Sequence, residues 1–185
     1  MSAPVEREIK LPYESASAAR AAVSALGATL RAPRRLQADV ILDTTDGRLR
    51  DMRSALRVRI EPERAYLTFK GTPQQGPMKV REEIETAVDD GSLTLTILGR
   101  LGFTVAFTYH KYREEHALPD VLIAIDETPV GTFVELEGSE AGITTTAVRL
   151  GRLPHEYIVD SYRTLYVREC ERRGVTPSDR MVFSE

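Results

Sequence analysis

The sequence predicts an α+β protein in which about eight strands form one antiparallel sheet, closed or strongly curved, with helices outside it. Two observations support this prediction. Segments that alternate apolar and polar residues outnumber helical segments, and the connections between them are short. The order of strand, helix and several strands also occurs twice along the chain, which suggests two similar halves. Strand-rich chains with short connections favour an antiparallel sheet that curves or closes on itself.

The first half of the chain contains one predicted helix. Val5 to Leu11 alternates in the manner of a strand. Ser15 or Ser17 then caps an alanine-rich helix that reaches Leu26 and stops at Gly27. An Asp-Gly turn and a loop with proline and glycine at residues 71–78 separate the later strands. These strands are predicted at Gln37 to Leu42, Ser54 to Ile60, Ala65 to Lys70 and Lys79 to Val88.

The second half begins with a helix from Asp90 or Ser92 to Leu101. Strands follow at Phe103 to His116, Val121 to Asp126 and Thr132 to Glu137, and helices at Glu140 to Leu150 and Val159 to Arg173. We expect residues 1–173 to form a single domain and residues 174–185 to form a C-terminal tail.

Composition excludes several classes of function. The 25 Lys and Arg residues nearly balance the 28 Asp and Glu residues, which argues against nucleic-acid binding through a basic surface. No apolar run approaches the length of a membrane span. The first residues lack an apolar signal core, so a cytoplasmic protein is expected. One cysteine, Cys170, excludes an internal disulfide and a cysteine-based zinc site.

The polar faces of the predicted strands carry almost only charges. Glu6, Glu8 and Lys10 share one face of the first strand. Like charges two residues apart repel each other, so such faces need counter-charges nearby. The other charged faces hold Arg57 and Arg59, Lys70, Arg81 with Glu83 and Glu85, Lys111 and Arg113, Asp126, and Glu135 with Glu137.

If these faces turned inward, the interior would hold roughly seven carboxylates and a similar number of cations. Burying them without partners would cost several kcal/mol per ion, so the arrangement suits a wet tunnel that binds a highly charged ligand. Arginine forks and lysine ammonium groups suit a polyphosphate, and carboxylates suit Mg²⁺ or Mn²⁺. A sheet with one charged face in water would show the same alternation and stays open as an alternative.

The motifs also follow one another in a recognisable order. Glu6-Arg7-Glu8-Ile9-Lys10 is followed by Leu56-Arg57-Val58-Arg59, Thr68-Phe69-Lys70-Gly71, Arg81-Glu82-Glu83-Ile84-Glu85, Lys111-Tyr112-Arg113, Ile125-Asp126 and Glu135-Leu136-Glu137. As an ordered set covering about residues 4 to 170, they resemble the CYTH superfamily, the triphosphate tunnel metalloenzymes. Gly99 to Phe103 and Asp160 to Tyr162 look like its class IV adenylyl cyclase branch.

The resemblance implies an eight-stranded antiparallel closed β-barrel, a triphosphate tunnel, with surrounding helices. Seven cations would bind the triphosphate: Lys10, Arg57, Arg59, Lys70, Arg81, Lys111 and Arg113. Lys10, Lys111 and Arg113 would be catalytic. Mg²⁺ or Mn²⁺ would be held by Glu6, Glu8, Asp126, Glu135 and Glu137, with Glu83 and Glu85 as metal ligands or as partners of the cations. Ser161 and Tyr162 could cap the tunnel or pack beside it, and packing is preferred.

Three functions follow from the resemblance. The first is metal-dependent hydrolysis of inorganic triphosphate, ATP or thiamine triphosphate. The second is a class IV adenylyl cyclase that converts ATP to cyclic AMP and pyrophosphate. The family's cyclases often carry a His-Phe pair ahead of Glu-x-Glu-x-Lys, and Met1 to Val5 contain none, which favours hydrolysis. The third is a non-catalytic polyphosphate-binding module, disfavoured by the retained carboxylates. The expected partner is a small-molecule triphosphate substrate, with a homodimer as a family-level expectation.

Overall fold

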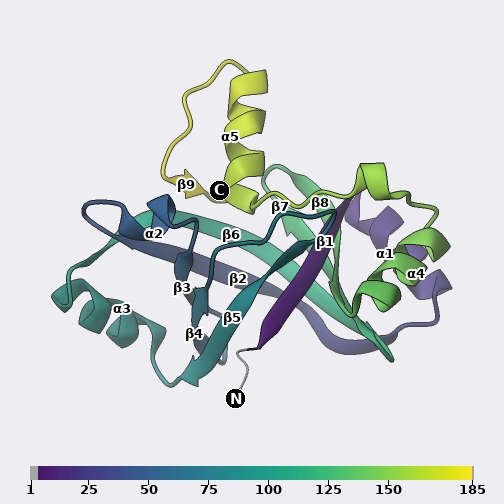
Figure 1. Ribbon diagram of the computed structural model, residues 1–185, viewed down its shortest axis with the longest axis horizontal. Helices are drawn as coiled ribbons and strands as arrows, with labels where there is room; N and C mark the ends of the chain where they lie inside the picture. The colour runs from purple at the N-terminus through teal and green to yellow at the C-terminus, as the bar shows by residue number, and fades with distance from the viewer. Residues whose placement is uncertain (1–3, 185) are drawn as a thin grey trace.

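Eight strands form a closed hydrogen-bonded ring in the computed structural model, which describes residues 4–184 (Figure 1). The ring order is β2-β3-β4-β5-β1-β8-β7-β6, and pairing of β2 with β6 closes it. Every pairing in the ring is antiparallel. The strands are β1 (Val5–Tyr13), β2 (Thr29–Thr44), β3 (Ala55–Ile60), β4 (Ala65–Lys70), β5 (Lys79–Val88), β6 (Phe103–Leu118), β7 (Val121–Thr128) and β8 (Gly131–Gly138). The predicted α+β fold is confirmed.

The helices lie outside this ring (Figure 1). They are α1 (Ala16–Ala25), α2 (Arg48–Asp51), α3 (Gly91–Arg100), α4 (Glu140–Arg149), α5 (Tyr162–Arg172) and the 3₁₀ turn η1 (Pro154–Glu156). Ser15 and Asp90 cap α1 and α3 by accepting backbone N–H groups, as the sequence predicts. The predicted start of the last helix at Val159 is wrong, because the chain stays extended until Ser161 caps α5.

The strand β2 is much longer than predicted. It begins at Thr29 rather than Gln37, and its first half pairs with the end of β6. Two irregularities interrupt this pairing, at Leu30/Ala32 and Ala32/Arg35, and Pro33 lies within the second. A proline cannot donate to a strand ladder and is tolerated at such bulges. The polar, proline-containing segment therefore lacks the regular alternation that identifies a strand.

The apolar core lies between the ring and its covering helices. Val23 of α1 and Ile143 of α4 pack against Ile9, Ile123 and Leu136 on the outer faces of β1, β7 and β8, and all five are fully buried. A smaller cluster lies under α3. Because successive strand side chains point to opposite faces, the charged neighbours of these residues point into the ring. The alternative of a charged outer face is therefore excluded.

The C-terminal residues fold back onto the ring. The strand β9 (Arg180–Met181) pairs in parallel with β6, beside α5 (Figure 1). Met181 is buried in a cluster with Phe107, Tyr109 and Tyr162. This cluster joins the C-terminal segment to the tunnel wall. None of the described helices has the length and apolar character needed to cross a membrane.

Candidate functional site

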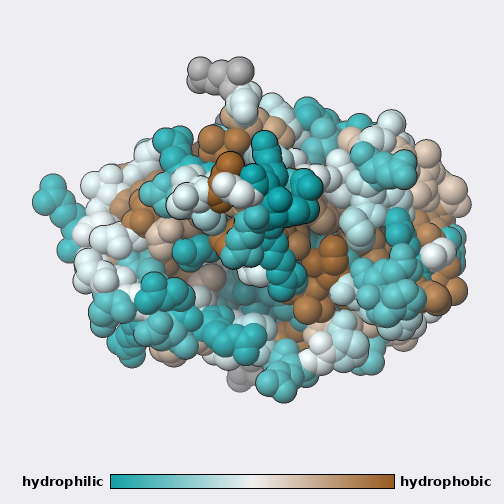
Figure 2. Space-filling view, turned by 90° about the horizontal axis from the view of Figure 1, so that it is seen from above, coloured by the Kyte–Doolittle hydropathy of each residue, from teal (hydrophilic) through white to brown (hydrophobic). Residues whose placement is uncertain are grey.

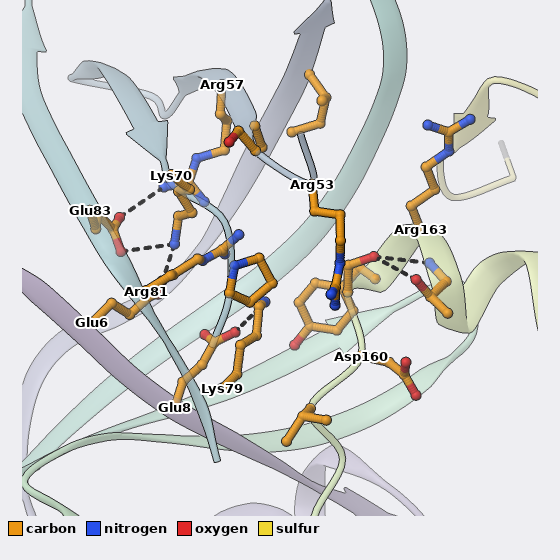
Figure 3. Close-up of a pocket in the computed structure, with 18 of the residues that line it drawn as sticks. Glu6, Glu8, Arg53, Arg57, Lys70, Lys79, Arg81, Glu83, Asp160 and Arg163 are labelled. Atoms are coloured by element: carbon orange, nitrogen blue, oxygen red, sulfur yellow. Dashed lines mark hydrogen bonds and ion pairs between the residues drawn. The ribbon is translucent and has the colours of Figure 1, made fainter. Parts of the chain in front are cut away.

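The ring encloses a cavity of about 740 Å³, a size suited to a nucleotide-sized ligand. Every charged residue predicted for the site lines this cavity except Asp126, which lies buried behind its wall. The opening toward α5 is bounded by Arg53 and Arg163 (Figure 3). In the view from above, the surface is hollowed, and hydrophilic side chains gather around much of the hollow (Figure 2). The cavity is therefore a charged tunnel with an accessible mouth.

Acidic side chains gather where β1 meets β5 and β8. Glu8 lies opposite Lys79 in the pairing with β5 and opposite Glu137 in the pairing with β8. Oε1 of Glu8 accepts hydrogen bonds from Lys79 Nζ at 2.6 Å and Lys10 Nζ at 3.0 Å. Glu6, two residues before Glu8 on the same strand, forms an ion pair with Lys70, whose Nζ lies 2.7 Å from Oε1 of Glu6. We call Glu6, Glu8 and Glu137 the acidic cluster.

Glu137 differs from its two neighbours in the acidic cluster. Within residues 4–184 its carboxylate has neither a hydrogen-bond nor an ion-pair partner, whereas Glu6 and Glu8 each contact two cations. Burial and the negative charges of Glu6, Glu135 and Glu83 raise the pKa of Glu137 to about 7. An uncompensated negative charge at this position attracts an additional cation.

Asp126 anchors a second group of charges, on β6 and β7. Its Oδ2 accepts hydrogen bonds from Lys111 Nζ at 2.9 Å and Arg113 Nη2 at 2.6 Å, and its Oδ1 accepts one from Arg113 Nε at 2.7 Å. Although burial raises it, the charges of Arg113 and Lys111 hold the pKa of Asp126 far below its usual range. Burial and the charge of Arg113 lower the pKa of Lys111 to about 8. The oxygen atoms of Asp126 are therefore committed to orienting cations.

Tyr162 reaches this group of charges from α5. The segment that precedes α5 is hydrogen-bonded to β1. Ile158 and Lys10 exchange backbone hydrogen bonds of 2.9 and 3.0 Å, just past Glu8, the last β1 residue that pairs with β5. This anchorage places the Tyr162 hydroxyl 2.6 Å from Asp126 Oδ2. Tyr162 packs in a buried cluster, as preferred from the sequence, and in addition donates this hydrogen bond.

Asp39 is a site residue that the sequence analysis missed. It is fully buried on β2, and its Oδ1 lies 2.9 Å from Arg59 Nε and 3.4 Å from Arg57 Nε. Although burial raises it, the charges of Arg59 and Arg57 lower the pKa of Asp39. The available signal was the alternation of Gln37 and Asp39 with apolar neighbours. Asp39 orients the two arginines of the Arg-x-Arg motif.

The acidic cluster fits Mg²⁺ or Mn²⁺ by its chemistry. Carboxylate oxygens are the ligands these hard cations prefer, and Glu137 offers a carboxylate without a partner among the described residues. Across residues 4–184, no three acidic, histidine or cysteine side chains converge as a ready-made metal centre. The reason is visible in the contacts, because Lys70 and Lys79 occupy oxygen atoms of Glu6 and Glu8. Glu6, Glu8 and Glu137 are the residues that would hold the metal.

The sequence pattern of the CYTH domain family matches residues 5–148, so the chain belongs to this family. A protein of Methanocaldococcus jannaschii, provisionally named an adenylate cyclase, is 32% identical over 111 residues. The match covers 60% of this chain and 63% of that protein, so this chain spans less than two thirds of its curated relative.

Solved structures share the fold at low sequence identity. A Vibrio parahaemolyticus protein, provisionally named an adenylate cyclase, has a TM-score of 0.76 at 16% identity and covers 89% of this chain and 98% of its own. A Pyrococcus horikoshii protein has a TM-score of 0.72 at 23% identity, with 86% and 98% covered. A Hippeastrum protein described as having a dominant triphosphatase activity has a TM-score of 0.62 at 19% identity, with 94% and 97% covered.

Proposed function

We propose that this protein is a divalent-metal-dependent enzyme that binds a triphosphate in its tunnel and hydrolyses it. The observation that carries this proposal is the set of buried cations and carboxylates that line one cavity. Among residues 4–184, the carboxylate of Glu137 is left without an ion-pair partner in this set, which leaves it available to a metal. A chain of phosphates in the cavity would contact the cations along its length and a metal at the acidic cluster.

The side chains of the tunnel have distinct proposed roles. Lys10, Lys111 and Arg113 contact the reacting phosphate and stabilise the charge that develops on it. The remaining phosphates are bound by two further pairs of cations. Asp39 holds Arg57 and Arg59, and Glu6 holds Lys70 and Arg81. Mg²⁺ or Mn²⁺, held by Glu6, Glu8 and Glu137, would supply positive charge to phosphate oxygens and would activate the attacking oxygen.

Three carboxylates have supporting roles in this proposal. Asp126 orients Lys111 and Arg113, and Glu135 lies between Lys10 and Arg113, with its oxygens 3.1 and 2.6 Å from their nitrogens. Glu83 holds Lys70 at 2.9 Å. Each of these carboxylates keeps a cation directed into the tunnel, so the phosphate site is formed before the substrate arrives.

A second candidate is cyclisation of ATP to cyclic AMP and pyrophosphate. One structural feature favours it beside hydrolysis. The cavity extends past the charged residues to the apolar side chains of Leu49, Phe107 and Val159, which could contact a nucleoside. The name of the Methanocaldococcus jannaschii relative points in the same direction.

Product analysis separates these functions. The purified protein is incubated with inorganic triphosphate or ATP, each with Mg²⁺ or Mn²⁺, and the products are resolved by chromatography. Orthophosphate release supports hydrolysis, whereas cyclic AMP with pyrophosphate supports the cyclase. Tight triphosphate binding with no product supports the polyphosphate-binding module. A Glu8→Gln variant serves as the control for activity that depends on the acidic cluster.

A further inference from the structure

Lys79 is a buried lysine that the proposed reaction does not use. The chain has only four lysines, and the other three are assigned to the phosphates. Lys79 is the first residue of β5, and only 9% of its surface is exposed. Its side chain points to Glu8, and the ammonium nitrogen lies 2.6 Å from Oε1 (Figure 3).

This contact places a positive charge within the acidic cluster. In the strand register, Lys79 lies opposite Glu8 on one side, and Glu137 lies opposite Glu8 on the other. Lysine carries a compact point charge on a flexible stem. Lys79 thus supplies Glu8 with a positive charge from within the chain, in addition to that of Lys10.

A divalent cation and the Lys79 ammonium would compete for the charge of one carboxylate, that of Glu8. Mg²⁺ binds carboxylate oxygens at about 2.0–2.1 Å and demands regular geometry, while Oε1 of Glu8 already accepts from two ammonium groups. Two cations on one oxygen also repel each other, and this repulsion is strong away from bulk water. Oε2 of Glu8 has no partner among residues 4–184, but a metal there would lie beside the ammonium on Oε1. Metal binding to Glu8 is therefore weakened as long as Lys79 stays, and it is strengthened when Lys79 moves away.

We propose that Lys79 is a built-in competitor of the divalent metal, so that its ammonium group sets the metal affinity of the acidic cluster. The inference rests on the metal site of the proposed function and deepens it. Lys79 neutralises Glu8 in the metal-free protein. When metal and triphosphate enter together, the displaced ammonium gains phosphate oxygens as new partners. Metal consequently binds weakly to the protein alone and more tightly in the presence of triphosphate.

The alternative role for Lys79 is that of one more phosphate ligand. The two roles differ in what happens when the charge is removed. A competitor of the metal, once neutralised, leaves a site with higher metal affinity and leaves metal-free triphosphate binding intact. A phosphate ligand, once neutralised, weakens triphosphate binding in the absence of metal.

Lys79→Met tests this because methionine keeps an unbranched apolar side chain and removes the charge. Calorimetry measures binding of Mn²⁺ alone, and separately binding of inorganic triphosphate in the presence of a chelator. We expect Mn²⁺ affinity to rise about tenfold and triphosphate affinity to stay within about twofold of wild type. Lys79→Arg retains the charge and should keep near wild-type Mn²⁺ affinity. Arg172→Met removes a largely exposed cation far from the cluster and should change neither measurement.

Thermal unfolding of each variant establishes that it is folded. Equal Mn²⁺ affinity in wild type and Lys79→Met would overturn the role of Lys79. If Glu8→Gln still lowers the Mn²⁺ affinity of both proteins, the proposed function is left standing. Weaker metal-free triphosphate binding in Lys79→Met would assign Lys79 to the phosphates instead and overturn the proposal. Absence of Mn²⁺ binding by wild type, both with and without triphosphate, would overturn the proposed metal-dependent function as well.

Discussion

The hydroxyl of Tyr162 donates a 2.6 Å hydrogen bond to Oδ2 of Asp126, which joins an outer helix to the wall of the tunnel. The same oxygen accepts from Lys111 and Arg113. The Tyr162 ring centroid also lies 5.3 Å from Lys10 Nζ and 5.1 Å from Lys111 Nζ. Tyr162 therefore lies next to two of the cations assigned to the reacting phosphate, Lys10 and Lys111, and shares the Asp126 oxygen with the third, Arg113.

Tyr162→Phe should remove the hydrogen bond to Asp126 and keep the packing of the ring. The phenylalanine ring keeps its packing against Phe133, but Asp126 loses one of its donors. A hydrogen bond to a charged group contributes about 1.5–3 kcal/mol, and we expect the free energy of unfolding to fall by about that amount. We also expect kcat/KM for the triphosphate to fall at least about tenfold, because Lys111 and Arg113 lose a fixed partner.

Urea unfolding and steady-state kinetics measure these two effects. The matched control is Tyr166→Phe, which removes a hydroxyl from the same helix whose partner is Ser178 rather than a tunnel residue. The control should leave the kinetics near wild type. Equal kinetic losses in both variants would assign the effect to α5 as a whole rather than to the bond with Asp126.

Glu137→Gln should separate metal binding from stability. The carboxylate has no ion-pair partner within the described residues and lies in the negative field of Glu6, Glu135 and Glu83. Removing its charge should leave the unfolding temperature unchanged or raise it, because repulsion is relieved. If Glu137 holds the metal as proposed, losing its carboxylate should nevertheless weaken Mn²⁺ binding at least about tenfold.

Glu135→Gln is the informative comparison for this prediction. Its carboxylate contacts Lys10 and Arg113 at 3.1 and 2.6 Å, so its neutralisation should lower the unfolding temperature. Calorimetry with Mn²⁺ and a thermal unfolding scan cover both variants. Full Mn²⁺ affinity in a folded Glu137→Gln protein would remove Glu137 from the proposed metal ligands.

Asp39→Asn should destabilise the protein in a pH-dependent way. The substitution leaves Arg57 and Arg59 without their buried counter-charge, which costs about 3–5 kcal/mol when one partner of a buried pair is removed. The pKa of Asp39 is lowered in the folded protein, although burial opposes the charges of Arg59 and Arg57. Its stabilising contribution is therefore fully present above the unfolded pKa of about 4 and is lost as the pH falls toward the folded value.

Urea unfolding of wild type and Asp39→Asn at a series of pH values checks this expectation. The difference in unfolding free energy should be largest and constant near neutral pH and should narrow below about pH 4. A difference that stays the same at all pH values would show that Asp39 stabilises the fold by shape and hydrogen bonding rather than by its charge.

The sequence could predict the strands and which charged residues share a face, because both depend on local alternation. Alternation alone left open whether these faces point into a tunnel or into water, and the resemblance to the CYTH superfamily favoured the tunnel. A strand period of two places Glu6, Glu8 and Lys10 on one face whatever the rest of the chain does. Contacts between distant residues could not be predicted this way. Lys79 meets Glu8 across 71 positions, and Tyr162 meets Asp126 across 36. Neither pairing leaves a periodic signal.

Other differences have equally local causes. The first half of β2 was not predicted because Pro33 and the bulges around it interrupt the alternation. Asp39 was passed over because a single carboxylate among apolar neighbours resembles an ordinary strand face. The strand β9 has only two residues, Arg180 and Met181, too few for any pattern. Its position depends on packing against β6 rather than on propensity.

Met181→Ala tests whether the C-terminal segment contributes to the tunnel. Met181 is 1% exposed and packs in one cluster with Phe107, Tyr109 and Tyr162, of which the last three line the cavity. Truncating a buried methionine costs about 2–5 kcal/mol. The void left by the truncated side chain would lie beside Tyr162, so we also expect KM for the triphosphate to rise several-fold. Mn²⁺ binding at the acidic cluster, which is not part of the Met181 cluster, should stay unchanged. Val175→Ala, at a half-exposed position in the same segment, is the control and should change neither stability nor KM. A loss of stability with normal KM would show that the segment supports the fold alone, whereas a parallel loss of Mn²⁺ binding would show that α5 and the acidic cluster respond together.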